Sequence, residues 1–510
     1  MSLSSISPVH TIRYVARAAA QLLPSVLQPA FGDSRATPEA STSRQPPPSR
    51  FDPADYDVDP TSGFLPSEPP LSRLPADFEL WECALDAANA PNGVLSLGED
   101  MSEQALAKRE SSRKWRESIA SAPVLSTASL QGDVRWLRRA HHVLAFLVHF
   151  YVHSTPPAQP AAPMRVPKSL AVPLVEVSRV LEIAPVLTFA DTVLWNYALV
   201  DSSKPLSADN IRSQTLFTAS NKAARDEQNF YLCCLGIEIR GIEALQIITK
   251  YQNMPSVSSP QAVAEIKSAL SSLCSMINDL TSILTSVRCT CDPHAFYFAI
   301  RPWFRGSDAG GPNSPGWIFE GVGDSTDLEL SGPSAGQSSL MHSLDVFFDI
   351  DHKLEKPRLP APSEQNKKSD RTFMQRMQRY MPGRHQQFLN ALGSSANPLR
   401  EVVVRTPALH ESYDSCIKAL KAFRDAHMRI ACLYVVSMSR SEAAQEAARK
   451  AGCPVAAMFD KMRENGELPA PPVTERKVVR GTGGNELSNL LKACRDATTR
   501  ALVSQNEARS

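Results

Sequence analysis

His427 is the residue in this sequence whose position most directly suggests chemistry. It lies on an apolar stripe that recurs every three or four residues from Tyr413 to Tyr434, while charged residues such as Asp414 occupy the opposite face. Arg424 precedes it by one turn of the expected helix. A neutral, inward-facing imidazole beside a cation suits an axial ligand to iron in an anionic macrocycle, with the arginine pairing a propionate. The plainer alternative is a hydrogen-bonded core histidine.

An arginine at the end of an aromatic run is the second candidate. The run extends from Ala295 to Ile300 and ends in Arg301. Such a run is most often plain core. A guanidinium is costly to bury without an anion, however, and a carboxylate can accept two parallel hydrogen bonds from it. Arg301 is therefore a candidate for binding a carboxylate-bearing ligand.

A serine motif offers an alternative chemistry. Gly332 to Gly336 reads GPSAG, which matches the G-x-S-x-G turn of serine hydrolases, and Asp345 and His427 follow Ser334 in the chain order of those enzymes. The motif needs a strand before it and a helix after it, within repeated strand–helix units. Only the short polar segment 327–330 precedes it. A serine hydrolase with Ser334 as nucleophile stays open as an alternative function.

Other groups of potential ligands give weaker signals. His149 and His153 are four residues apart, which suits a metal pair on one helix face, but no third ligand follows at a suitable spacing. We interpret both, together with His141 and His142, as structural or surface residues. The ten cysteines include no CxxC pair, so they suggest neither a zinc ribbon nor a thioredoxin-like site. A reducing, intracellular compartment fits best.

The elements that must position these side chains are helical almost throughout. Thr406 and Pro407 suit the cap and first residue of the long helix that carries His427. No repeated strand pattern accompanies the helical periods, so we predict an all-α fold. The expected helices cover residues 77–88, 103–120, 134–152, 174–181, 189–199, 230–251, 262–287, 406–436 and 487–503.

Composition and charge exclude several classes of protein. The chain has 510 residues and 43% hydrophobic residues, enough for two or three folded domains. Its net charge of +1 gives no field that would attract nucleic acid or an acidic membrane surface. The most apolar run, Val143 to Val152, is about half the length needed to cross a bilayer, so we expect no transmembrane helix.

Proline-rich segments and insertions divide the chain. Residues 1–49 are an extension that is either disordered or a mitochondrial transit peptide, since they contain arginines and serines and no acid before Asp33. The proline-rich stretch 154–163 ends a small helical domain, residues 50–163, and a large helical domain follows over residues 164–510. Within the large domain, we expect 356–371 and 438–480 to be mobile insertions.

Six segments, in order and at similar spacing, resemble the indoleamine 2,3-dioxygenase family, and the proline-rich loops and the amino-terminal extension resemble its fungal branch more than its animal branch. The six segments are FADTVLWNY (189–197), HAFYFAIRPWFRG (294–306), SAGQSSLMHSLDVFFDI (334–350), QRYMPGRHQQFL (378–389), SYDSCIKALKAFRDAHMRIA (412–431) and RGTGGNEL (480–487). The resemblance covers about residues 50–505. It implies an all-helical, two-domain haem protein in which the large domain holds haem b and the small domain covers it.

The activity implied by the resemblance is the opening of the indole C2–C3 bond of L-tryptophan with O₂ on ferrous haem. The product is N-formyl-L-kynurenine, in the first step of the kynurenine pathway towards NAD. L-tryptophan or related indoleamines, O₂ and an external reductant are the expected partners. We expect a monomer in the cytoplasm, or in the mitochondrion if residues 1–30 act as a transit peptide.

The resemblance also assigns roles by position. His427 would be the proximal iron ligand, Arg424 the propionate partner and Arg301 the partner of the substrate carboxylate. Asp345 would contact residues that bind the haem without touching the haem itself. Ser334 and Ala335 match residues whose backbone approaches haem and substrate, and the expected substrate pocket is lined by Phe189, Thr192, Val193, Phe230, Cys234, Phe296 and Thr482.

Several pocket positions depart from the family pattern. Cys234 stands where the animal enzymes have serine, Phe189 where they have tyrosine, Pro333 where they have glycine, and Tyr231 replaces another aromatic residue. These positions lie around the expected substrate rather than around the iron ligand. They leave open a haem protein of the same fold with little dioxygenase activity.

Overall fold

The computed structural model describes residues 50–157, 162–310, 314–323, 328–352, 373–441 and 487–504. The described residues from Phe51 onward belong to one compact unit. The described residues are mostly helical, which confirms the predicted all-α class. The boundary near residue 163 between a small and a large domain remains a proposal.

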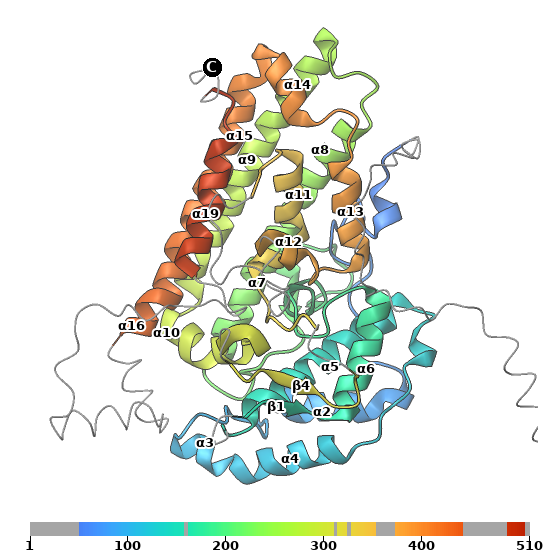
Figure 1. Ribbon diagram of the computed structural model, residues 1–510, viewed down its shortest axis with the longest axis vertical. Coiled ribbons are helices and arrows are strands. Elements are labelled where there is room, and N and C mark those ends of the chain that lie inside the picture. Colours follow the sequence, from blue (N-terminus) through green and yellow to red (C-terminus); the bar gives the residue numbers. More distant parts are fainter. Residues whose placement is uncertain are drawn as a thin grey trace, which may run out of the picture. The chain divides into compact units, whose positions relative to one another are not determined.

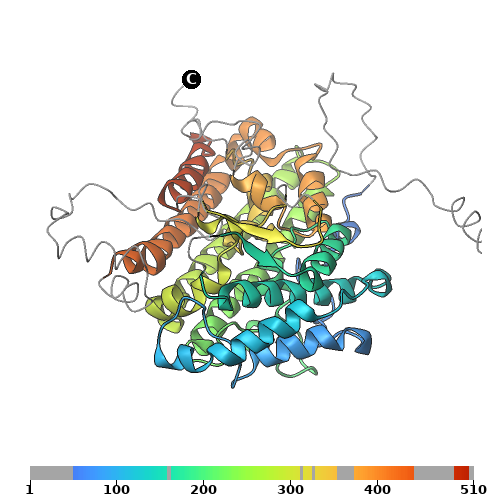
Figure 2. The same cartoon turned by 60° about the horizontal axis from the view of Figure 1, so that its bottom comes forward.

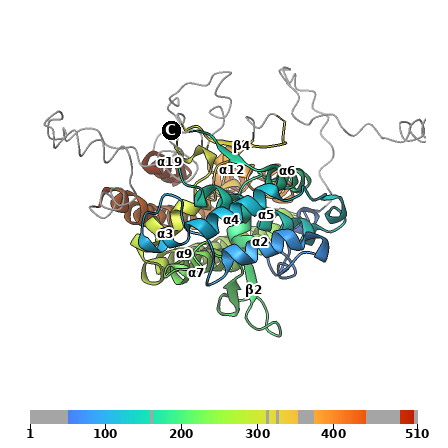
Figure 3. The same ribbon diagram turned by 90° about the horizontal axis from the view of Figure 1, so that it is seen from below.

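Five helices make up the first part of the folded unit. Figures 1 and 3 show α2, α4, α5 and α6 grouped together, and α5 packs against both α2 and α6. Asp133 caps α5 by accepting the Arg135 backbone N–H at 2.7 Å, and α5 is buried on nearly every side from Ala140 to Phe150. The bounds are α2 (Glu79–Asn89), α3 (Glu103–Ala107), α4 (Arg109–Ser121), α5 (Val134–Ser154) and α6 (Lys168–Leu181).

Long helices form most of the remaining chain. In Figure 1, α9, α15 and α19 lie side by side, and α7 packs against α9. The bounds are α7 (Ala224–Arg240), α8 (Ile242–Gln252), α9 (Pro260–Thr290), α10 (Pro293–Ala295), α11 (Ser339–Phe347), α12 (Phe373–Gln378), α13 (Gly383–Gly393), α14 (Leu399–Arg405), α15 (His410–Ala431), α16 (Met438–Arg440) and α19 (Leu487–Arg500).

Short elements fill the connections between the helices. Strand β1 (Met164–Val166) pairs in parallel with β4 (Trp317–Phe319), and β2 (Tyr197–Leu199) pairs antiparallel with β3 (Ile211–Ser213). Figure 2 shows the β1–β4 pair lying across the helices. Three wide helical turns of the π type and three tight turns of the 3₁₀ type matter for the site: η4 (Ala190–Leu194), η6 (Phe296–Ile300), η12 (Cys432–Ser437), η7 (Arg301–Phe304), η9 (Ala335–Gln337) and η11 (Pro407–Leu409).

Three predicted helices are wrong in part, and the one expected over 103–120 is broken at Lys108 into α3 and α4. The helix expected over 189–199 ends at Leu194, because both groups of the Asn196 side-chain amide bond to the Thr215 backbone, at 2.8 and 2.9 Å, and start the β2–β3 pair. The helix expected over 230–251 is split at Gly241. A Cβ there would lie 2.1 Å from the Leu340 side chain, so only glycine allows this approach.

The helix that carries His427 also differs from its prediction. Pro407 opens the turn η11, Thr406 makes no side-chain cap, and α15 begins at His410. The apolar stripe is confirmed, since Tyr413, Cys416, Ile417 and Leu420 are fully buried. Asp414, predicted to face solvent, is buried because its carboxylate accepts the backbone N–H groups of Val503 and Ser504, at 2.9 and 3.2 Å.

Several predictions fall outside the described residues. They concern the extension 1–49, the insertion 356–371, most of the insertion 438–480 and the pocket residue Thr482. Of the second insertion, the structure describes only 438–441, which includes the short helix α16. In the described ranges, no helix is both long enough and apolar enough to cross a membrane.

Candidate active site

His427 lies near the C-terminal end of α15, where its imidazole is partly buried. Within the described part of the chain, this imidazole has no hydrogen-bond partner. Burial and the nearby Arg424 guanidinium lower the pKa of His427. The ring is therefore neutral at neutral pH, with a nitrogen lone pair free to bind a metal.

Arg424, one turn before His427, is held by two other elements. Its guanidinium forms an ion pair with Asp345 of α11 and donates to Thr498 of α19 and, at 3.3 Å, to the Cys494 carbonyl. Its side chain is 11% exposed, so one edge still reaches solvent. The arginine is thus fixed in direction while remaining available to an anion beside His427.

The Asp345 carboxylate binds a second cation that sequence analysis missed. Nε2 of His352 donates to Asp345 Oδ2 at 2.6 Å. Burial opposes ionisation of both groups, but Arg424 and His352 lower the pKa of Asp345 to about 2, and the hydrogen bonds to Asp345 and Cys494 raise the pKa of His352 to about 9. His352 follows the end of α11, outside any periodic pattern, so no sequence signal pointed to it.

Aromatic rings gather beside α7, as the expected pocket requires. The rings of Phe230 on α7 and Phe296 on η6 are 4.9 Å apart between centroids, and Phe296 meets Tyr434 edge-on at 5.7 Å. Phe189 belongs to a neighbouring apolar cluster, and Cys234 packs against that cluster. Burial raises the pKa of the Cys234 thiol, which therefore stays protonated.

Arg301 directly follows the η6 turn that carries Phe296. Its guanidinium carbon lies 5.5 Å from the centre of the Tyr297 ring. Burial and the positive charge of Arg305 lower the pKa of Arg301 to about 10. It remains charged at neutral pH, and an anionic ligand would stabilise that charge.

The segment around Ser334 is tied to Phe189 through Gln337. The Ser334 hydroxyl accepts the Gly336 N–H at 3.2 Å, and Ala335 is exposed. The buried Gln337 side chain accepts the Phe189 N–H at 2.8 Å and donates to the Gly332 carbonyl at 3.0 Å. The Thr192 hydroxyl, three residues after Phe189, donates to the Thr188 carbonyl at 3.1 Å.

The serine hydrolase alternative is wrong. Residues 328–333, before Ser334, form no strand, and the Ser334 hydroxyl caps η9. Asp345 binds Arg424 and His352 rather than His427. The arrangement therefore contains neither the strand–turn–helix elbow nor the relay between acid and base that a hydrolase needs.

The histidine pair on α5 does not form a metal site. His149 and His153 bind backbone carbonyls at 2.7 and 2.8 Å, and His141 and His142 are buried and hydrogen-bonded too. Among the described residues, no group of three or more histidine, cysteine or acidic side chains could hold a metal ion. Their interpretation as structural residues agrees with these contacts.

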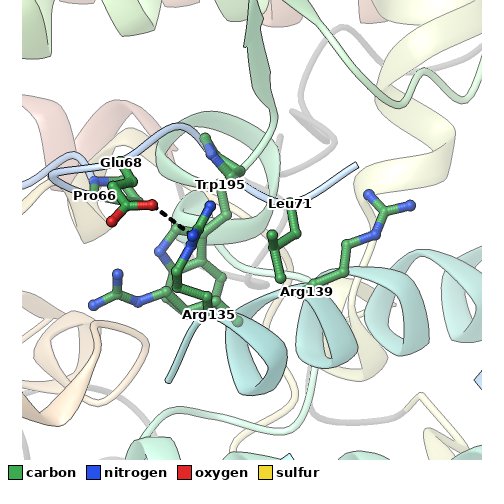
Figure 4. Close-up of a pocket in the computed structure, with 8 residues that line it drawn as sticks. Pro66, Glu68, Leu71, Arg135, Arg139 and Trp195 are labelled. Atoms are coloured by element: carbon green, nitrogen blue, oxygen red, sulfur yellow. Dashed lines mark ion pairs between the residues drawn. The ribbon is translucent and has the colours of Figure 1, made fainter. Parts of the chain in front are cut away.

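A separate cleft lies between residues 66–71, α5 and Trp195 (Figure 4). The empty volume of the cleft is about 290 Å³, which includes space open to solvent. Each of its three arginines is paired with a carboxylate: Arg135 with Glu68 at 2.5 Å, Arg138 with Asp57, and Arg139 with Glu82 at 2.6 Å. The cleft therefore offers little charge to attract a ligand.

The residues around α15 fit a haem better than any other group considered. Haem iron needs one neutral imidazole nitrogen that is not bonded to another protein group, and His427 meets that requirement among the described residues. A propionate needs a cation, and Arg424 is held one turn away.

Comparison with known proteins identifies the family of the chain. The family model for indoleamine 2,3-dioxygenase matches residues 52–501. Indoleamine 2,3-dioxygenase of Saccharomyces cerevisiae is 31% identical over 471 residues, covering 89% of this chain and 94% of the yeast protein. Indoleamine 2,3-dioxygenase 1 of Rattus norvegicus is 30% identical over 454 residues, covering 88% and 95%. The 6-hydroxytryptophan 2,3-dioxygenase of Fusarium equiseti is 29% identical, covering 75% and 84%.

These matches make the chain a dioxygenase, an enzyme of the oxidoreductase class. More narrowly, it belongs to the indoleamine 2,3-dioxygenase family, whose members depend on haem. The three relatives are named as dioxygenases, so the alternative of a haem protein with little dioxygenase activity is not supported.

Proposed function

We propose that this enzyme opens the indole C2–C3 bond of L-tryptophan with O₂, giving N-formyl-L-kynurenine, and that it binds haem b through His427. The observation that carries the proposal is the neutral, partly buried His427 imidazole, which has no partner among the described residues. Family membership supports the reaction, and the aromatic and cationic side chains near α7 support the substrate.

The bound haem would supply the redox chemistry and the activation of O₂. His427 would bind the haem iron, and Arg424, oriented by Asp345, would pair with a propionate. Because Asp345 is shared with His352, the direction of the Arg424 guanidinium would depend on both neighbours.

The remaining pocket residues would bind and orient the substrate. The Arg301 guanidinium would hold the carboxylate of L-tryptophan, and Phe296 and Phe230 would contact its indole. The other proposed contacts come from Phe189, Thr192, Val193, Cys234, the backbone of Ser334 and Ala335, and Thr482. Aromatic walls would also exclude water from the reacting carbon atoms.

Four further points remain proposals. They are a small domain (50–163) that covers the large one (164–510), a monomeric state, an external reductant for the haem, and a cytoplasmic or mitochondrial location. Related indoleamines belong among the substrates to be tested, since one relative is named for 6-hydroxytryptophan.

Reconstitution with haem and isotopically labelled O₂ tests the proposal. We expect a Soret band, and turnover of L-tryptophan to a product that contains both labelled oxygen atoms. A protein that shows no Soret band after reconstitution, or a product with one labelled oxygen, would contradict it.

A further inference from the structure

Helix α5 reaches the segment that carries Arg301 through two histidines. We propose that His149 and His153 are positioning residues, which hold Arg301 where it binds the substrate carboxylate. This inference rests on the proposed function, because it assumes that Arg301 binds a carboxylate. It assigns a role in substrate recognition to side chains that do not themselves touch the substrate.

The two histidines bind two carbonyls shortly after Arg301. Nδ1 of His149 lies 2.7 Å from the Trp303 carbonyl oxygen, and Nε2 of His153 lies 2.8 Å from the Arg305 carbonyl oxygen. A carbonyl oxygen can only accept, so the ring N–H must donate in both bonds. His149 therefore carries its proton on Nδ1 and His153 carries its proton on Nε2.

Both rings are neutral donors at neutral pH. Burial lowers the pKa of His149 to about 4, against a small opposing effect of the Trp303 carbonyl. Burial, His149 and Arg305 together lower the pKa of His153 well below its ordinary value. Each tautomer is thus selected by the single carbonyl that the ring faces.

The segment also contacts the backbone of residues 330–332. A Cβ on Gly332 would lie 1.8 Å from the Phe304 carbonyl oxygen, and a Cβ on Gly306 would lie 2.2 Å from the Leu330 carbonyl oxygen. The Ser307 N–H also donates to the Leu330 carbonyl at 2.8 Å. The two backbones touch at the paired glycines, which limits how far the segment can move while the histidine bonds are in place.

Trp303 also holds the segment in place through its aromatic contacts. Its indole is buried and stacks on Phe217, with centroids 5.5 Å apart and planes 10° apart. Phe150 of α5 meets the same indole at 5.5 Å and 65°. Residues 303–306 are therefore held by α5, by an aromatic ring and by residues 330–332, and Arg301 stands two residues before Trp303 in the same turn, η7.

Loss of either histidine bond would leave a carbonyl without its donor and let the segment shift. A shift of about 1 Å in a binding group can cost up to about a hundredfold in rate. The effect should appear in recognition of the substrate carboxylate, because Arg301 lies on the affected segment. It should be small for an indoleamine that lacks the carboxylate.

Amide substitutions test the tautomers and the role together. Asparagine places an N–H near the position of Nδ1, and glutamine places one near that of Nε2. We expect His149→Asn and His153→Gln to bind and turn over L-tryptophan within about threefold of the parent enzyme. We expect the mismatched His149→Gln and His153→Asn to raise KM and Kd for L-tryptophan about tenfold, with binding of tryptamine and the Soret band unchanged.

Two results would overturn the inference: equal losses for L-tryptophan and tryptamine, or matched and mismatched variants that behave alike. His153 is only partly buried, so its two variants remain informative if the His149 variants unfold. Arg301→Ala, measured in parallel, separates this inference from the proposed function. If Arg301→Ala shows no selective loss for L-tryptophan, the proposed function fails; if only the histidine variants lack selectivity, the positioning role fails alone.

Discussion

The four histidines on α5 and His427 on α15 differ in their hydrogen-bond partners. His141, His142, His149 and His153 each donate to or accept from a neighbouring group, whereas His427 has no partner among the described residues. The four bonded rings stabilise the protein itself. The unbonded ring keeps a nitrogen available for a ligand, so counting hydrogen bonds separates the two roles where spacing along the helix does not.

Replacing one histidine from each helix should break this comparison most strongly. His427→Ala should bind far less haem and lose activity, yet the haem-free protein should unfold like the parent. His141→Ala should keep its haem stoichiometry but lose about 3 kcal/mol of stability, because the buried Asp191 carboxylate loses its partner at 2.7 Å. Haem content and denaturant unfolding measure both effects. Normal haem content and activity in His427→Ala would show that His427 is not the iron ligand.

Arg301→Ala should have the next largest effect. Loss of a buried cation opposite a carboxylate should lower kcat/KM for L-tryptophan about a hundredfold to a thousandfold, with an unchanged Soret band. Arg305→Ala is the matched control. Arg305 pairs with Glu99 at 3.3 Å, and both side chains are exposed. That change should therefore lower kcat/KM less than about threefold. Equal losses for tryptamine and L-tryptophan in Arg301→Ala would assign Arg301 another role.

The pair of His352 and Asp345 makes part of the stability depend on pH. The hydrogen bond to Asp345 raises the pKa of His352 to about 9, above the ordinary value of 6.5, despite the burial that opposes it. Its contribution is therefore fully present below pH 6.5 and is lost as the pH rises through 9. Between those limits the parent should lose about 1 to 3 kcal/mol that His352→Gln does not lose.

Denaturant unfolding of the haem-free protein at a series of pH values measures this difference. A decline that is equally steep in His352→Gln would place its origin in another group. At the acid end, Arg424 and His352 lower the pKa of Asp345 to about 2. The contribution of Asp345 should therefore persist until the pH falls below about 4.

Cys234→Ser should have the smallest effect. A thiol is a weaker hydrogen-bond donor than a hydroxyl, and such a contact is worth about 1 kcal/mol, so kcat/KM for L-tryptophan should change less than about tenfold. Steady-state kinetics of the two proteins measure the change. A nearly inactive parent that Cys234→Ser rescues about a hundredfold would show that the hydroxyl is essential.

Local patterns predicted most of the helices, and contacts between distant residues caused the errors. The buried stripe on α15 follows from the spacing of its apolar residues, which is a local property. The buried position of Asp414 depends on residues 503 and 504, and the β2–β3 pair depends on the contact between Asn196 and Thr215. Neither contact leaves a periodic signal in the sequence.

The candidate site shows the same division. His427 and Arg424 were predicted from spacing on one helix, and Arg301 from its place after an aromatic run. The roles of His149, His153 and His352 depend on acceptors between 7 and 154 residues away. Only the folded structure shows that these three histidines are bonded and that His427 has no partner among the described residues.

Rescue of His427→Gly by free imidazole tests the central claim most directly, namely that His427 binds the haem iron. Removal of the side chain leaves space for imidazole to replace the missing ligand without a protein bond. We predict that the variant lacks the parent's ferrous haem spectrum, that added imidazole restores that spectrum together with turnover of L-tryptophan, and that imidazole has no such effect on His142→Gly. A His427→Gly protein with the parent's ferrous spectrum in the absence of imidazole would contradict the account.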